Sequence, residues 1–135
     1  MGTPPKQAEI LSNLITRLRG DAGITALVST RIYNHVPQDE PFPFVRARWG
    51  SESEWDTKDS QGFSGSLIID IWVEVHGDSS MLFIKDAIYL ALHEIPFSPT
   101  TGQGVCLRYS NGDSFVEPDG VSHHGVMNFN YIVTN

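Results

Sequence analysis

The 135 residues are about the length of one ordinary domain, and two independent cores would each be too small, so a single domain over residues 1–135 is expected. Hydrophobic residues make up 40% of the chain and charged residues 19%, a composition that excludes a disordered chain. Sixteen acidic against nine basic side chains give a formal net charge of −7, which argues against nucleic-acid binding as the main source of affinity.

The single cysteine excludes an internal disulfide and favours synthesis in the cytoplasm. Cys106 stands between Val105 and Leu107 in a strand pattern, and we expect an inert, buried thiol. The first residues lack a cationic segment followed by an apolar one, and no run approaches the roughly 20 apolar residues of a membrane span. A soluble protein without a membrane partner is therefore expected.

Two helices are predicted at the start of the chain. Apolar residues at the spacing of an amphipathic helix are Ile10, Leu11, Leu14, Ile15 and Leu18. Pro5 and Gly20 mark its limits, because proline suits a first turn and glycine a left-handed cap. Asp21 can then cap a second, short helix. The buried stripe of that helix is expected to be Ile24, Leu27 and Val28.

Strand and loop signals follow. Residues 31–36 are predicted as a short strand, and 37–43, with three prolines, as a loop. A strand resumes near Phe44, and the polar stretch Ser51 to Gly65 is predicted to be a hairpin tip that could bind partners. The next strand alternates apolar and polar residues from Leu67 to Val75.

Two apolar residues, Ile68 and Trp72, interrupt the polar face of that strand. Either a neighbouring element of the same chain or a partner subunit could cover them. Residues 78–80 are then predicted to cap a helix that ends at Pro96. Its apolar stripe is Met81, Ile84, Ile88, Ala91, Leu92 and Ile95.

Two more strands are predicted on either side of a turn at residues 117–120, with Met127, Phe129, Tyr131 and Val133 on one face of the last strand. Helices interleaved unevenly with strands predict an α+β fold, in which two principal helices pack on one face of a mainly antiparallel mixed sheet.

Several short runs, in the same order, resemble the phage tail-completion family. They are residues 21–28 followed by 31–33, residues 37–45, Trp55-Asp56-Thr57-Lys58, and Asp119-Gly120 with residues 123–129. Each run is weak alone, but their shared order across residues 8–134 is specific. Residues 97–104 match nothing in the family.

This resemblance implies a structural tail-terminator domain with no catalytic site and no cofactor. Members are similar to proteins that form a hexameric ring at the neck end of the tail, stop tube polymerisation and offer a docking surface to the head connector. The implied partners are further copies of the chain, the tail tube protein and a connector or stopper protein, with DNA only as passing cargo. A stopper or adaptor ring of the head–tail joint is the alternative within the same class.

A closed ring needs a heterologous contact, in which one patch of each subunit meets a different patch of the next. Exposed strand edges and the Ser51–Gly65 hairpin are predicted to supply part of it. Aromatic residues commonly anchor interfaces. The predicted subunit-interface residues are Trp55, Asp56, Lys58, Trp72, His123 and His124.

Two groups of residues resemble sites of metal chemistry. His123 and His124, with His35, His76 or His93, could suggest a metal site, but adjacent strand residues point to opposite faces, so satisfied packing or interface histidines are favoured. The pair Asp39-Glu40 with Asp56-Thr57-Lys58 resembles the acids and lysine of a metal-dependent nuclease. Such spacing arises easily in a polar segment, so solvated hairpin charges are favoured there and no metal site is predicted.

Overall fold

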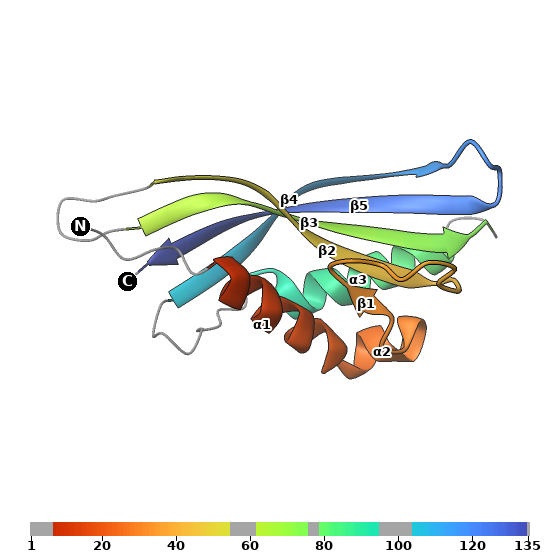
Figure 1. Cartoon of the computed structure of the whole chain (residues 1–135), viewed down its shortest axis with the longest axis horizontal. Helices are drawn as coiled ribbons and strands as arrows, with labels where there is room; N and C mark the ends of the chain where they lie inside the picture. Colours follow the sequence, from red (N-terminus) through yellow and green to blue (C-terminus); the bar gives the residue numbers. More distant parts are fainter. Residues whose placement is uncertain (1–6, 55–61, 76–78, 95–103, 135) are drawn as a thin grey trace.

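The computed structural model describes residues 7–54, 62–75, 79–94 and 104–134. Their elements are α1 (Gln7–Arg19), α2 (Ala22–Val28), β1 (Ile32–Tyr33), β2 (Phe44–Glu54), β3 (Gly62–Glu74), α3 (Ser79–Leu92), β4 (Gly104–Val116) and β5 (Ser122–Thr134). The sheet order is β1-β2-β3-β5-β4, and only the β1–β2 pair is parallel. The helices lie on one side of the twisted sheet and leave its other side uncovered (Figure 1). This confirms the predicted α+β fold.

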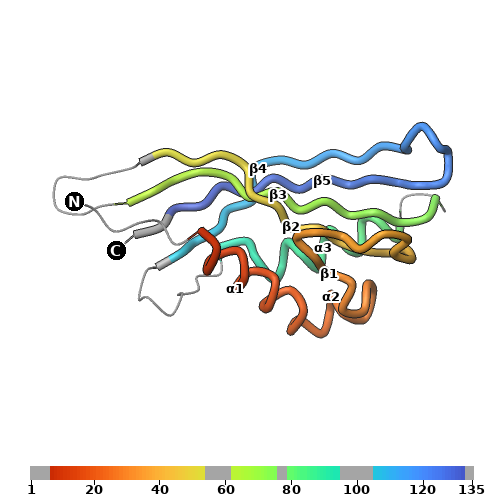
Figure 2. Tube along the Cα trace, in the orientation of Figure 1, coloured from red at the N-terminus to blue at the C-terminus, as the bar shows by residue number. Residues whose placement is uncertain are grey.

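The core lies between the helices and the helix-facing side of the sheet. Each long strand sends alternate apolar side chains toward it, as the period of two dictates. Figure 2 shows how α1 and α3 run beneath the three central strands. The largest fully buried side chains of this cluster are Tyr131, Phe129, Ile10, Leu14, Leu18, Ile24, Ile32, Leu67, Ile69, Ile71, Met81 and Ile88.

The two N-terminal helices form largely as the sequence predicts. The Gly20 amide donates to the Thr16 carbonyl as α1 ends, and the Ile24 amide donates to Asp21 Oδ1 at 3.0 Å to cap α2. The predicted burial of Leu27 is wrong, because its side chain is 39% exposed. It lies on the rim of a pocket of about 250 Å³, which Phe83 of α3 also lines.

The predicted strand at 31–36 is shorter than expected, because only Ile32 and Tyr33 pair with β2. The side chain of Asn34 then donates to the Ala47 carbonyl at 2.9 Å and takes the place of a backbone partner on β2. A side-chain amide can satisfy the edge of β2 without extending the strand. The β1 strand therefore ends where Asn34 turns out of the ladder.

The polar stretch predicted as a hairpin tip is partly strand. Serine hydroxyls join β2 to β3 across the ladder, at Ser51 with Ser66 and at Ser53 with Ser64, each at 3.4 Å. A register shift between Trp49 and Glu52 accommodates this polar extension. The prediction that the whole stretch forms the tip is wrong, since pairing continues to Glu54 and resumes at Gly62.

The C-terminal half follows the predicted order of helix, strand, turn and strand. The α3 stripe of Met81, Ile84, Ile88, Ala91 and Leu92 is buried as predicted, while Ile95 lies outside the described residues. The turn between β4 and β5 is closed by Asp119, whose carboxylate accepts from the Val121 and Ser122 amides. No helix in the described part of the chain is long and apolar enough to cross a membrane.

Cys106 is exposed, so the prediction of a buried thiol is wrong. Its neighbours Val105 and Leu107 both point into the core. Strict alternation along β4 therefore turns Cys106 to the uncovered face of the sheet, where it pairs with Ile132 of β5.

Candidate functional site

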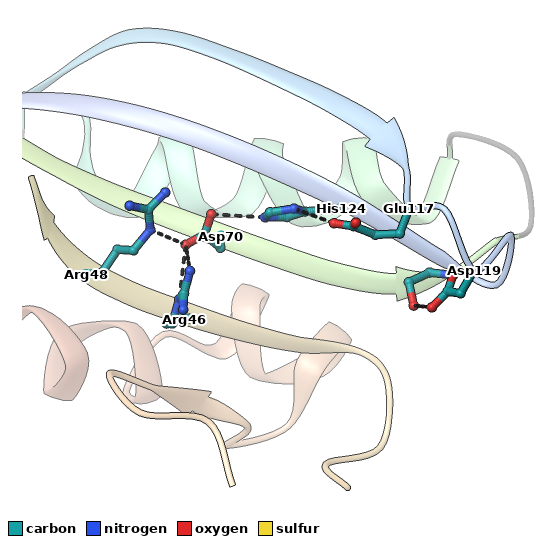
Figure 3. A network of polar contacts seen from close by, with 7 residues as sticks. Arg46, Arg48, Asp70, Glu117, Asp119 and His124 are labelled. Atoms are coloured by element: carbon teal, nitrogen blue, oxygen red, sulfur yellow. Dashed lines mark hydrogen bonds and ion pairs between the residues drawn. The ribbon is translucent and has the colours of Figure 1, made fainter. Parts of the chain in front are cut away.

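The uncovered face of the sheet carries a buried carboxylate, Asp70 of β3. Although none of the described helices covers this face, the Asp70 side chain is 0% exposed, because three neighbouring side chains close over it. Arg46 and Arg48, alternate residues of β2, donate to Asp70 Oδ2 at 2.9 and 2.6 Å. His124 of β5 contacts the other oxygen, Oδ1, at 3.0 Å through Nε2 (Figure 3). Three strands thus share one carboxylate.

His124 links this carboxylate to a second one. Its Nδ1 lies 2.9 Å from Oε1 of Glu117, which follows the end of β4. Both neighbours of the ring are acceptors, so both contacts are hydrogen bonds only when each ring nitrogen carries a hydrogen, as in the imidazolium. The five residues Arg46, Arg48, Asp70, His124 and Glu117, called here the Asp70 cluster, therefore tie β2, β3, β4 and β5 together.

The cluster is electrostatically favourable to the ionised form of Asp70. Burial by itself raises the pKa of the carboxyl, but hydrogen bonds from Arg48, His124 and Arg46 outweigh burial and hold the pKa below its usual value. Arg46 and Arg48 are 35% and 41% exposed. Solvent therefore screens their attraction, so the cluster contributes less stability than fully buried ion pairs would.

Acid should weaken this cluster in a defined pH window. Because the Asp70 pKa is lowered in the folded state, its stabilisation is complete above the unfolded pKa of about 3.9 and is lost as pH falls through the folded value. We expect the stability difference between the natural chain and Asp70→Asn to be large at pH 6 and to shrink at pH 3. Denaturant unfolding at both pH values measures it.

The difference in unfolding free energy between the natural chain and Asp70→Asn cancels the contribution of the other acid-sensitive groups. Asp119 also has a pKa below its usual value, because the Ser122 and Val121 amides donate to it, but it titrates in both proteins. An equal stability difference at pH 6 and pH 3 would contradict the role assigned to Asp70.

Aromatic rings form a second feature of the same face. Each ring packs on the next one across β2, β3, β5 and β4. The distances between ring centroids are 5.7 Å for Phe42–Phe44, 5.2 Å for Phe44–Trp72, 4.3 Å for Trp72–His124 and 5.0 Å for His124–Phe115. These five residues are called the aromatic ladder. The Arg46 guanidinium lies over the Trp72 ring, 5.3 Å from its centroid. Charged and apolar groups therefore alternate across an uncovered surface.

The structure brings together two of the predicted interface residues, Trp72 and His124, as stacked rings. Trp72 is covered by rings of the same chain, since Phe44 and His124 stack on it. His123 lies on the opposite, helix-covered face and is only 5% exposed, so its side chain has little surface for a partner. Trp55, Asp56 and Lys58 lie outside the described residues.

Three of the candidate residues for a metal site, His93, His124 and Glu40, contact other groups of the chain. His123 and His124 point to opposite faces, as strand alternation predicts, and His93 Nδ1 accepts from the Tyr109 amide at 2.9 Å. Glu40, from the nuclease-like pair, accepts from the Tyr33 hydroxyl at 2.9 Å. His76 lies outside the described residues. Within the described ranges, no three His, Cys, Asp or Glu side chains converge as a metal site would require.

The Asp70 cluster was not predicted from the sequence, although its signal is present. Arg46 and Arg48 alternate on β2, and Asp70 stands on the polar face of β3. The missing information was the register, which places Arg46 directly opposite Asp70 and Trp72 opposite His124. A carboxylate opposite two alternating arginines is a pattern that a register search could find.

A small α+β chain whose uncovered sheet face presents aromatic rings, arginines and a carboxylate is of the class that works through contacts with other proteins. Residues 12–134 match the family described as Tail completion protein gp17. The chain belongs to this family and is a structural protein of a phage tail, which confirms the resemblance found in the sequence.

Two solved structures share the fold. One is a chain from a structure described as "Virion of native gene transfer agent (GTA) particle", with 20% identity, a TM-score of 0.74 and coverage of 90% of this chain and 92% of that one. Another is 15% identical, with a TM-score of 0.62 and coverage of 90% and 94%. No curated protein matches the sequence.

Proposed function

We propose that copies of this chain assemble into a closed, hexameric ring at the neck end of the tail. The ring ends tube polymerisation and offers the head connector a docking surface. Membership of the tail-completion family, over residues 12–134, is the observation that carries this proposal. The shared fold with a chain of a gene transfer agent virion supports a role in a phage-like particle.

The two sides of the molecule suit a ring. A ring that closes needs a contact between two different patches, whereas identical patches would give isolated pairs. The helix layer and the uncovered sheet face point in opposite directions (Figure 1). One chain therefore carries two unlike surfaces of the kind that a heterologous contact requires.

One of the two sheet edges, that of β4, is partly occupied by bonds within the chain. On β4, three backbone groups are already bonded within the chain: the Glu94 amide donates to Leu107 O at 2.8 Å, His93 accepts from the Tyr109 amide, and Lys85 Nζ donates to Asp113 O at 2.7 Å. These bonds block pairing with a partner strand along that stretch. The side-chain surfaces are thus the stronger candidates for the ring contact.

Passing DNA is compatible with the charge of the chain. A formal charge of −7 per subunit multiplies around a ring, and an acidic assembly does not retain a phosphate backbone. The DNA is therefore proposed as cargo that crosses the ring, and the tube protein and the head connector as the bound partners.

Tail length tests termination directly. Particles made without the chain should have overlong or heterogeneous tails in electron micrographs, and supplying the chain should restore a single length. Normal tail length without it would overturn the proposed terminator. Order of addition separates a terminator from a stopper or adaptor, because a terminator binds free tail ends before heads are present.

Trp55→Ala is expected to weaken ring assembly at least several-fold, since interface energy concentrates in aromatic anchors. Sedimentation or native mass measurement of the purified chain, alone and with tail tubes, reports it. Trp49→Phe is the matched control, because Trp49 packs on Tyr131 with ring centroids 5.0 Å apart on the core side. Unchanged assembly of the Trp55 variant would remove that residue from the contact.

A further inference from the structure

Helix α3 is apolar on two opposite sides. One side is the stripe that packs on the sheet, and the other, called here the outer stripe, consists of Leu82, Phe83, Asp86 and Leu90. Leu82, Phe83 and Leu90 are 52%, 62% and 73% exposed. At 3.6 residues per turn these positions form one strip, directed away from the sheet.

This strip is unlike an ordinary surface. Single exposed leucines are common, but three large apolar side chains gathered on one exposed helix face are not explained by chance exposure alone. The strip also continues into the pocket of about 250 Å³ lined by Leu27, Phe42 and Phe83, which makes the surface concave at one end. A contiguous apolar patch with a concave end is typical of a protein contact site.

The uncovered sheet face is complementary to the outer stripe. Its aromatic ladder offers apolar rings, of which Phe115 is 45% exposed. Arg46 and Arg48 are 35% and 41% exposed while the Asp70 carboxylate between them is 0% exposed, so a partner would meet the guanidinium groups at this point of the face; the Glu117 carboxylate lies farther along it, beyond His124. The outer stripe has its charge, the exposed carboxylate of Asp86, in the middle of its apolar residues. Each surface thus carries apolar groups around a charge of opposite sign.

We propose that the outer stripe of α3 in one copy packs on the aromatic ladder of the next copy, with Asp86 facing Arg46 and Arg48. This inference rests on the proposed ring and names its contact. Because the outer stripe and the ladder are different patches of the chain, the contact is heterologous, and a rotation between neighbours can close it. The charge pair fixes the register, and the apolar groups supply affinity.

Two variants of the full chain test the contact. The first, Phe83→Ser with Leu90→Ser, removes the apolar outer stripe and keeps the sheet face. The second, Ile68→Ser with Phe115→Ser, alters the sheet face and keeps the outer stripe; Ile68 pairs with Arg48 and Asn128 on that face. Ser12→Asp, at an exposed position of α1, is the matched control. Circular dichroism and thermal unfolding establish that each variant is folded.

Each double variant alone should need at least a tenfold higher protein concentration than the natural chain to form rings, while Ser12→Asp assembles as the natural chain does. An equimolar mixture of the two variants should form pairs and nothing larger, because only one junction per pair is intact. Sedimentation over a concentration series measures both results, with tail tubes present if the natural chain needs them.

The outcomes separate the contact from the ring. If the natural chain forms rings and either folded variant does too, or if the mixture forms no pairs, the α3–ladder contact is overturned and the ring stands. If the natural chain forms no ring in either setting, the proposed function fails with it. Asp86→Arg gives an independent check, since repulsion from Arg46 and Arg48 should weaken assembly more than Asp86→Asn does.

Discussion

Replacing Asp70 with asparagine is expected to lower the free energy of unfolding by about 2 kcal/mol, within the range of about 1.5–3 kcal/mol for hydrogen bonds to charged groups. The side chain keeps its size, so the loss reflects charge and hydrogen bonding. Arg46, Arg48 and His124 would all lose the carboxylate that they share. We place the loss below that of fully buried ion pairs because both arginines reach solvent. Urea unfolding at pH 7 measures it.

The matched control is the exposed ion pair between Glu94 and Arg108, whose side chains are 53% and 72% exposed. Glu94→Gln is expected to cost no more than about 1 kcal/mol, because solvent screens such pairs. If Asp70→Asn were as mild as Glu94→Gln, the Asp70 cluster would be no more than a set of surface ion pairs.

Gly65→Ala is expected to destabilise the fold by roughly 2–3 kcal/mol, the upper part of the range for overpacking. Gly65 stands opposite Glu52, where the β2–β3 register shifts. A Cβ at this position would overlap the Ser51 carbonyl oxygen and lie 2.8 Å from both Glu52 Cα and Tyr131 Cε1. Two of these obstacles are backbone atoms, so the strand itself must move. Thermal and urea unfolding report the loss.

Gly125→Ala provides the comparison, because its obstacle is a side chain. A Cβ there would overlap the Met81 sulfur and lie 3.0 Å from Lys85 Cε. An unbranched thioether and the end of a lysine can rotate away, so we expect a cost of about 1 kcal/mol or less. Equal losses for both variants would show that the backbone near Gly65 is freer to move than the register shift implies.

Much of the fold could be predicted from local patterns. The spacing of Ile10, Leu14 and Leu18 and the alternation from Leu67 to Val73 each reflect one buried face, and those residues are buried as expected. Asp21 caps α2 because a short carboxylate side chain accepts the amides that a helix start leaves free. These features depend on neighbours within a few residues, which a sequence shows directly.

The predictions that failed depend on what lies across the sheet or beside a helix. Leu27 fits a helical stripe, yet the short α2 leaves it on the rim of a pocket. Cys106 follows an apolar residue, yet alternation turns it outward. Residues 34–36 look like strand, yet the Asn34 side chain completes the ladder instead. For Leu27 and Asn34 a tertiary neighbour decided the outcome, whereas for Cys106 the alternation along β4 decided it.

The candidate site was half visible in the same way. Aromatic content indicated Trp72, and the histidine pair indicated His124, but neither pattern showed that they stack on each other. Their contact requires the β3–β5 register, which places Trp72 opposite His124. The same register brings His124 to Asp70, which lies 54 residues earlier in the chain. The functional class could be predicted from the family resemblance, whereas the site could be located only once the strand register was known.

Electron cryo-microscopy of intact particles, reconstructed at the junction of head and tail, tests the proposed ring. We expect six copies of this chain in a closed ring on the last tube layer, each with the helix layer of one copy against the sheet face of its neighbour. Absence of the chain from that junction, or a single copy there, would contradict it.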